Sequence, residues 1–441
     1  MGPIPHDTRT DTLLVLPMQV LAWAFFILPI IRLFIFRLTG FALPPSVHVA
    51  AITLVALLYL LVSHRKFTVP LSAPIGFSLL FLPLTTYLAV GGVSNTIGAI
   101  LATTWIYFLA PCCAILIGTI SADRAVGCAS GRPSQTVDRW LTVSTVCVIS
   151  GIIVNAVDLA LLGDSYFEVY KSFRTTAAAT FAGFSLPRLA GAYFSGLDLT
   201  FAIVMLLLIQ ASRGRRVAWV TRFILYVSVL FTFTRNAYVI LALWILISRL
   251  SNNSISRFGA IAYLLSPLLS LGVMTLLAFQ SASGQLEMNA ETSSVLTRLS
   301  SWVTISDAVL SNPTAGLFGL GLTQNALVPG ESDIYAIDSF FWELVCYAGA
   351  VAFIAYGVLF REVRIQALRK SSAVSRIALA LTALIPVAGT FNNMVGSMFS
   401  FVLFICYGLL GRFALANQGA TGQAPDLEVP RGGLAYDSPL R

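Results

Sequence analysis

The sequence has very little charge. Asp, Glu, Lys and Arg make up 10% of its 441 residues, whereas soluble domains carry roughly 25%. Hydrophobic residues make up 57% and gather in runs of about 20, the length that crosses a bilayer as a helix. The composition therefore predicts an all-α, polytopic membrane protein. The net charge of +8 is spread over short loops, so we expect no nucleic-acid surface.

Histidines, paired cysteines and metal signatures are also scarce. His6 and His64 fall on the predicted inner side and His48 begins the second apolar run, so no histidine is available as a base in the long polar loop. The cysteines show no spacing that predicts an extracytoplasmic disulfide or a zinc site. No Asp-x-Asp pair or nucleotide-binding loop occurs, and we predict neither a metal nor a cofactor.

The apolar runs predict twelve membrane-spanning helices. Two pairs of short spans are divided only by polar breaks, at 234–236 and at 391–393, and such breaks need cover from protein or water. The first run is too long for a signal-peptide core, so we expect it to remain as a helix. The predicted spans are 13–36, 47–63, 73–92, 97–121, 139–162, 189–210, 217–234, 236–250, 258–279, 337–360, 376–390 and 394–412.

Lys and Arg are distributed unevenly between the two predicted sides. With both termini cytoplasmic, 20 of the 27 basic residues fall inside, which is the expected asymmetry. We predict one transmembrane domain over 1–412, with a long extracytoplasmic loop at 280–336, and a disordered cytoplasmic tail over 413–441. The outer side keeps seven basic residues, which are Arg32, Arg37, Lys171, Arg174, Arg188, Arg235 and Arg298.

The long loop contains an amphipathic helix. It is predicted from about Ser293 to Ser311, with Asn312-Pro313 as its end and a turn at the glycines that follow. On a helical wheel, Arg298 falls inside the apolar arc of this helix, so we expect its guanidinium to face the protein. The alternative is a packing role with a local ion pair to Asp307 or Glu291.

Three other outer arginines are candidate anion ligands. Arg235 interrupts an apolar stretch, where an arginine costs at least about 2.5 kcal/mol on insertion scales, and it lies in the break at 234–236. Arg188 begins the mouth of the sixth span, and Arg174 precedes it in the smaller outer loop. The alternatives are a snorkelling residue at a helix end for Arg235 and an interfacial anchor for Arg188.

Carboxylates on the predicted outer side are few, and three of them are candidates for the general base or for sugar binding. Asp338 opens the tenth span, where it could also be an ordinary N-cap. Glu343 lies deeper in the same span, and Asp198 lies inside the sixth. Arginines in fixed positions, without a metal, can bind a diphosphate. At the outer face of a membrane a diphosphate is usually attached to a polyprenol lipid. If the diphosphate is a leaving group in glycosyl transfer, the arginines neutralise its charge and a carboxylate takes the proton of the accepting hydroxyl.

Several motifs match a known family in their order and spacing. They are Arg188-Leu-Ala-Gly191 followed by Asp198, then Thr234-Arg235-Asn236-Ala237, then Arg298 leading to Asn312-Pro313 and the glycines, and finally Asp338-Ser-Phe-Phe-Trp-Glu-Leu with Gly349. With these motifs the chain resembles the O-antigen polymerase and ligase superfamily. The resemblance covers roughly 185–360.

The resemblance implies a metal-independent glycosyltransferase of the bacterial inner membrane that uses undecaprenyl-diphosphate-linked saccharides. It implies that Arg235 and Arg298 are essential. Ligases of the superfamily use a loop histidine, which is missing here, so we expect a polysaccharide polymerase, with Asp338 as first candidate for the base and Arg188, Arg174, Asp198 and Glu343 as supporting residues. A flippase and a chain-length regulator are the implied partners. An O-antigen ligase and a twelve-helix saccharide transporter are the alternatives.

Overall fold

The computed structural model is helical over nearly all of the residues that it describes. These are 8–43, 110–127, 133–173, 178–181, 184–214, 218–282, 302–303, 306, 311, 313–319, 339–369, 372–390, 392, 394 and 397–421. The predicted helical class is therefore confirmed. One feature was not expected, a short antiparallel hairpin that pairs Ala178 with Pro187 and Phe181 with Phe184.

The described part of the chain forms a series of helices and one short hairpin. In chain order the elements are α1 (Thr8–Leu21), the π-helix η1 (Ala22–Ile27), α2 (Leu28–Thr39), α6 (Ala110–Gly127), α7 (Pro133–Leu162), η3 (Gly163–Ser165), α8 (Tyr166–Tyr170), β1 (Ala178–Phe181), β2 (Phe184–Pro187), α9 (Gly196–Ser212), α10 (Trp219–Leu230), α11 (Arg235–Arg249), α12 (Asn252–Ala282), α14 (Pro313–Phe318), α15 (Phe340–Leu368), α16 (Ala373–Gly389) and α17 (Met398–Thr421).

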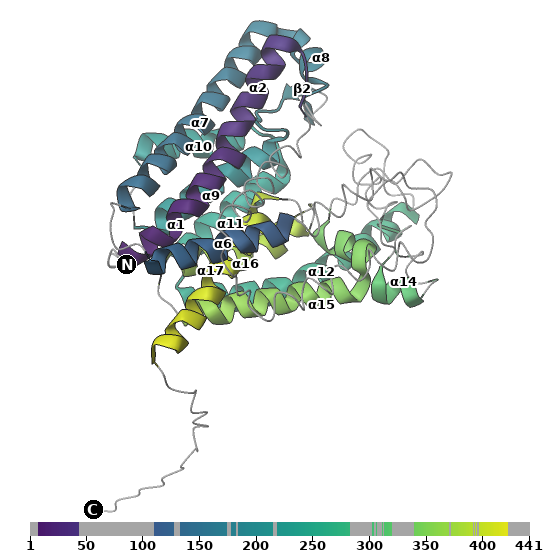
Figure 1. Ribbon diagram of the computed structural model, residues 1–441. Coiled ribbons are helices and arrows are strands. Elements are labelled where there is room, and N and C mark those ends of the chain that lie inside the picture. The colour runs from purple at the N-terminus through teal and green to yellow at the C-terminus, as the bar shows by residue number, and fades with distance from the viewer. Residues whose placement is uncertain are drawn as a thin grey trace, which may run out of the picture.

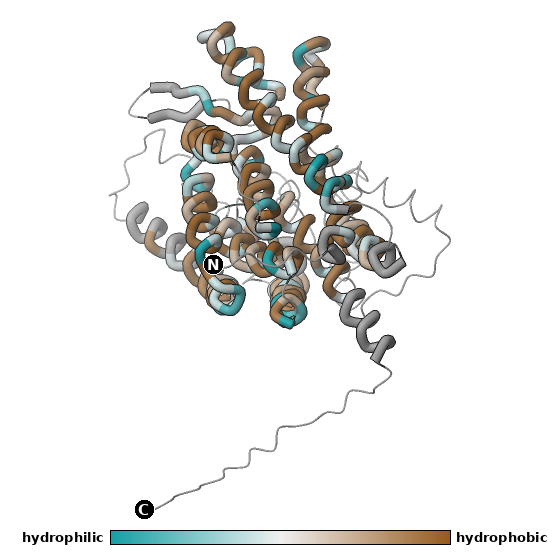
Figure 2. The backbone as a smooth tube through the Cα atoms, turned by 90° about the vertical axis from the view of Figure 1, so that its left-hand side faces the viewer, coloured by the Kyte–Doolittle hydropathy of each residue, from teal (hydrophilic) through white to brown (hydrophobic). Residues whose placement is uncertain are grey.

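Two groups of long helices diverge from the end of the molecule where the N-terminus lies (Figure 1). One group, with α2 and α7, runs toward α8 and the hairpin, and the other, with α12 and α15, runs toward α14. Helices α9, α16 and α17 lie between them and are buried over most of their length. Hydrophobic residues make up most of the described helices (Figure 2), and α10 and α12 expose many large apolar side chains.

Two described helices are long and apolar enough to cross a membrane, namely Thr12–Thr39 and Ser134–Tyr170. Both correspond to predicted spans. Among the other described helices, five shorter apolar segments also match predicted spans, and they are Ala110–Ala122, Gly196–Ser212, Trp219–Leu230, Ala373–Gly389 and Met398–Gly411. The predicted spans 47–63 and 73–92 lie outside the described residues.

Two predicted boundaries were wrong, and a third helix start was not predicted. Helix α9 begins at Gly196 rather than at 189, because residues 188–195 form a loop that ends in an N-cap. Pro313 is the first residue of helix α14, as the missing N–H of proline is tolerated at a first helical position. The predicted disordered tail starts too early, since α17 continues past Arg412 to Thr421.

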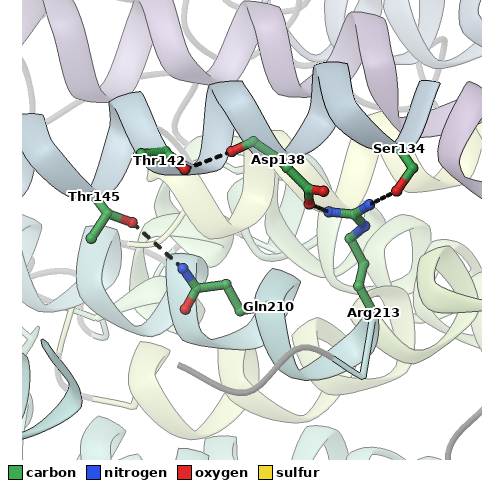
Figure 3. A network of polar contacts seen from close by, with 6 residues as sticks. All are labelled: Ser134, Asp138, Thr142, Thr145, Gln210 and Arg213. Carbon is green, nitrogen blue, oxygen red and sulfur yellow. Dashed lines mark hydrogen bonds and ion pairs between the residues drawn. The ribbon is translucent and has the colours of Figure 1, made fainter. Parts of the chain in front are cut away.

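Arginine contacts join helix ends at one end of the molecule, here called the basic end after Arg213 and Arg376. Arg213 at the end of α9 pairs with Asp138 near the start of α7, and it also donates to Ser134 at 3.4 Å. Figure 3 shows this network together with the nearby bond from Gln210 to Thr145. These contacts fix the basic ends of α7 and α9 against each other.

A second arginine joins three more helices at the same level. Arg376 at the start of α16 donates to the side chain of Asn252 and to the carbonyls of Ser248 and Leu250, each at 3.2 Å. It thereby connects the end of α11 with the start of α12. The opposite ends of α9, α11 and α16 consequently meet at another level, where the candidate site lies.

Candidate functional site

The loop that carries Arg188 meets the break before α11. The Leu189 N–H donates to the Phe231 carbonyl at 3.0 Å. A Cβ atom on Gly196 would lie 2.8 Å from the Thr232 Cβ and 3.2 Å from the Thr234 hydroxyl, so only glycine lets these segments approach so closely. Residues 188–196 and 231–236 therefore form one unit, although they are separate in sequence.

A second break joins this unit through a pair of asparagines. Asn236 donates from its side-chain amide to the Asn392 side-chain oxygen at 2.8 Å, and Asn392 donates to the Ala388 carbonyl, also at 2.8 Å. Asn392 is buried. The two polar breaks are thus in contact through this amide pair, which satisfies polar groups that lie within apolar stretches of the sequence.

The start of α15 packs against the same turn. The Ser339 hydroxyl lies 3.5 Å from the Gly389 carbonyl, to which it donates, and a Cβ on Gly389 would lie 2.6 Å from the Phe340 Cβ. We use the name polar junction for the four segments that meet here, which are 188–196, 231–236, 339–343 and the described residues of 389–397, namely 389, 390, 392, 394 and 397.

Arg235 is the exposed cation of the polar junction. It is the first residue of α11, and the N-cap Thr234 makes no side-chain capping bond. Its side chain is exposed, and among the described residues it forms no ion pair. A free cation and the uncapped N–H groups of a helix start favour an anion. Phe233, two residues earlier, has a φ of 47°, an uncommon value for a bulky residue that marks local strain.

Arg188 is half-buried and approaches the same helix. Its charge lies within electrostatic range of the Tyr238 hydroxyl on α11, and that hydroxyl donates to the Leu230 carbonyl at 2.8 Å. The structure therefore brings the predicted Arg188 and Arg235 to the same junction from different parts of the chain.

Asp198 caps its own helix. The Ser195 hydroxyl donates to the Asp198 carboxylate at 2.8 Å, and the Asp198 N–H donates back to the Ser195 hydroxyl at 3.2 Å. This reciprocal arrangement is a capping box with aspartate in place of glutamate. The contact gives Asp198 a structural role that is sufficient to explain its position.

Glu343 is a buried carboxylate in the first turns of α15, with 5% of its surface exposed. The neighbouring Trp342 stacks on Trp302, with ring centroids 6.3 Å apart, and both indoles are buried. Trp302 belongs to the predicted amphipathic helix of the long loop. This described residue of the loop therefore packs against the start of α15, next to Glu343.

Gly319 and Gly349 meet where α14 reaches α15. Gly349 has non-helical angles within α15, and a Cβ there would lie 2.6 Å from the Gly319 N–H nitrogen. Gly319 itself has a φ of 77°. The expected turn at the glycines is thus partly replaced by helix α14, and Gly319 ends that helix in the left-handed conformation that glycine tolerates.

Three predicted site residues, Arg174, Arg298 and Asp338, lie outside the described residues. Asp338 immediately precedes the described Ser339, and Arg298 lies one helical turn before Trp302 in sequence.

Sequence reasoning missed one buried arginine of the same region. Arg32 on α2 is 7% exposed, donates to the Phe173 carbonyl at 3.2 Å and lies 4.4 Å from the centre of the Phe173 ring. Its charge also acts on the Asp198 carboxylate. The sequence did contain a signal for this residue, because Arg32 lies within an apolar run. The same position also fits an ordinary basic residue at the outer end of a span, so the signal was not specific.

Comparison with known proteins adds no assignment, because no family model, curated protein or solved structure matches the chain.

Proposed function

We propose that the chain is a membrane glycosyltransferase that polymerises undecaprenyl-diphosphate-linked oligosaccharide repeat units at the outer face of a bacterial inner membrane. The observation that carries the proposal is that the segments with Arg188 and Arg235 meet in the polar junction, where the Leu189 N–H bonds to the Phe231 carbonyl. Two guanidinium groups beside a helix start suit a diphosphate, because each phosphate oxygen can accept charged and backbone N–H donors.

In this proposal the reaction is a single displacement at a sugar carbon. A hydroxyl of the acceptor repeat unit forms a bond to the anomeric carbon of the growing chain, and the bond from that carbon to the diphosphate oxygen breaks. The diphosphate leaves with the electron pair, and Arg235, Arg188 and Arg298 stabilise its charge. A carboxylate takes the hydroxyl proton, with Asp338 as first candidate and Glu343 and Asp198 behind it.

The proposed membrane setting has twelve spans and cytoplasmic termini. Two long apolar helices and the many exposed apolar side chains of α10 and α12 support residence in a bilayer, because soluble surfaces rarely carry such continuous apolar area. The remaining spans rest on the sequence. A flippase that delivers the repeat units and a regulator of chain length are the partners that this function requires.

The deciding experiment adds lipid-linked repeat units to the purified protein in lipid nanodiscs. The wild type is expected to form a ladder of polymer without any further acceptor. Arg235→Ala and Arg298→Ala should each reduce polymer by about 100-fold or more, the usual effect of removing a group that stabilises developing charge. Arg249→Ala is the matched control, because Arg249 is an exposed arginine at the other end of α11.

Each rival function gives a different result in this assay. Wild-type polymer yield from both arginine variants would contradict the site. Product that appears only when lipid A-core is added would assign a ligase, and movement of saccharide across the bilayer without lengthening would assign a transporter.

A further inference from the structure

One buried side chain holds the loop that carries Arg188. The Asn155 side-chain oxygen on α7 accepts from the backbone N–H groups of Ala190 and Gly191, at 3.0 and 3.1 Å. Gly191 has a φ of 58°, so the loop turns there in a conformation that favours glycine. Asn155 thus supplies the acceptor for two consecutive N–H groups that have left regular secondary structure.

Asn155 is itself fixed in orientation. Its side-chain nitrogen donates to the Tyr166 hydroxyl at 2.8 Å, and both residues are fully buried. Backbone N–H groups can only donate, so the amide oxygen must face the loop and the amide nitrogen must face Tyr166. A flipped amide would set donor against donor at both loop positions.

Aromatic and charged contacts hold Tyr166 in place. Its ring stacks on Tyr170 with centroids 4.6 Å apart, and the Tyr170 hydroxyl donates to Asp158. Asp158 in turn pairs with Arg37 on α2 at 2.9 Å. Through Tyr166, the short helix α8 therefore fixes the orientation of the Asn155 side chain, so that its oxygen faces the loop.

The surface of α7 is shaped to receive the loop. A Cβ on Gly151, one turn before Asn155, would lie 2.9 Å from the Ala192 nitrogen. On its other side the loop bonds through Leu189 to Phe231 in the break before Arg235. The loop is held between α7 and that break, and this placement sets the position of Arg188 relative to Arg235.

We propose that Asn155 is a positioning residue that holds Arg188 in register with Arg235 for binding of the lipid diphosphate, an inference that rests on the proposed function. In this role Asn155 does not touch the substrate. It affects diphosphate binding only by holding the loop that carries Arg188. A purely structural Asn155 would contribute to folding and leave the affinity for diphosphate unaffected in the folded protein.

The test measures binding of farnesyl diphosphate to the purified full-length protein in nanodiscs, together with hydrogen–deuterium exchange of the peptide that covers Ala190 and Gly191. Asn155→Leu keeps the volume and removes both acceptor bonds. It should weaken binding about tenfold and speed exchange in that peptide. Asn155→Asp keeps oxygens for both N–H groups and should restore most of the affinity and the slow exchange.

Asp138→Asn serves as the stability control. It weakens the ion pair with Arg213 at the basic end, so it should lower the melting temperature while leaving binding unchanged. Equal loss of affinity in Asn155→Leu and Asp138→Asn at matched stability would overturn the proposal, and so would unchanged exchange at Ala190 and Gly191 in Asn155→Leu. Failure of Asn155→Asp to restore binding would overturn it as well.

The proposed function and the positioning role can fail separately. A wild type that binds farnesyl diphosphate through Arg188 but makes no polymer would overturn the polymerase, while the binding and exchange results still decide the role of Asn155. A wild type that binds no diphosphate would overturn both.

Discussion

At the scale of single residues, Arg235 occupies a position that lowers the stability of its helix. A cation at the first position of a helix meets the positive end of the helix dipole, at a cost of about 0.3–1 kcal/mol. Arg235 occupies that position on α11, exposed and with no carboxylate paired to it among the described residues. A bound anion removes this cost, since it interacts with the guanidinium and the dipole together.

Asp198 allows a sharp distinction between a structural and a substrate-binding role. Because it shares a capping box with Ser195, we expect Asp198→Ala and Ser195→Ala each to lower the free energy of unfolding by about 1 kcal/mol. The double variant should lose little more than either single variant, since both changes remove the same interaction. Thermal unfolding in detergent measures all three.

Polymer yield from the same variants separates the two roles. Equal effects of Ser195→Ala and Asp198→Ala on yield would mean that Asp198 acts through the cap. A much larger loss in Asp198→Ala alone would contradict this and restore Asp198 as a residue that contacts substrate.

At the scale of helices and loops, the polar breaks were predictable and their partners were not. The sequence 234–236 interrupts an apolar stretch, as does 391–393, so both breaks can be located by composition. The bond between Asn236 and Asn392 joins positions that no local pattern relates. The start of α9 was missed because the apolar residues before Gly196 continue a helical-looking run, while Ser195 and Asp198 carry the true start signal.

The asparagine pair provides a test of how the breaks are joined. Asn236→Ala and Asn392→Ala should each destabilise the protein, and the coupling energy from the double-mutant cycle should be about 0.6–1.7 kcal/mol, the range for bonds between membrane helices. Both single variants should also lower polymer yield, since Arg235 adjoins Asn236. Zero coupling between the two substitutions would show that the pair does not form in the membrane.

Among the described residues, α6 and α17 cross in very close contact at two glycines. A Cβ on Gly118 would lie 2.1 Å from the Ile405 carbonyl oxygen, and one on Gly408 would lie 2.1 Å from the Ile115 oxygen. Small residues allow membrane helices to approach in this way. We therefore expect Gly118→Ala to destabilise the protein by about 1–3 kcal/mol through overpacking.

Gly272 on α12 is the matched control for this crossing. A Cβ at Gly272 would meet nothing within 4 Å, so Gly272→Ala should be neutral or stabilise the helix by up to about 1 kcal/mol. Melting temperatures in one detergent compare the two variants. A Gly118→Ala protein as stable as Gly272→Ala would mean that α6 and α17 do not cross at these glycines.

At the scale of the whole molecule, the helix ends sort into two levels. Arg213 and Arg376 join the ends of α7, α9, α11, α12 and α16 at one level, and the polar junction joins the opposite ends of α9, α11 and α16 at the other. The positive-inside count, which depends on the sequence alone, assigns Arg213 and Arg376 to one side and Arg188 and Arg235 to the other. Charge asymmetry could predict this sorting, whereas the divergence of the two helix groups (Figure 1) depends on packing that no count of residues contains.

The sidedness of the two levels is the prediction on which the proposed chemistry depends, because lipid-linked repeat units are polymerised on the outer face. Lys171, which follows α8, and Arg361 in α15 are both exposed, and the charge count places them on opposite sides. In a cysteine-free background, Lys171→Cys should react with a membrane-impermeant maleimide in intact spheroplasts. Arg361→Cys should react only after permeabilisation. The reverse pattern would put the polar junction in the cytoplasm, where Arg188 and Arg235 would face soluble phosphates, and an outer-face polymerase would then be untenable even if both arginines bind diphosphate.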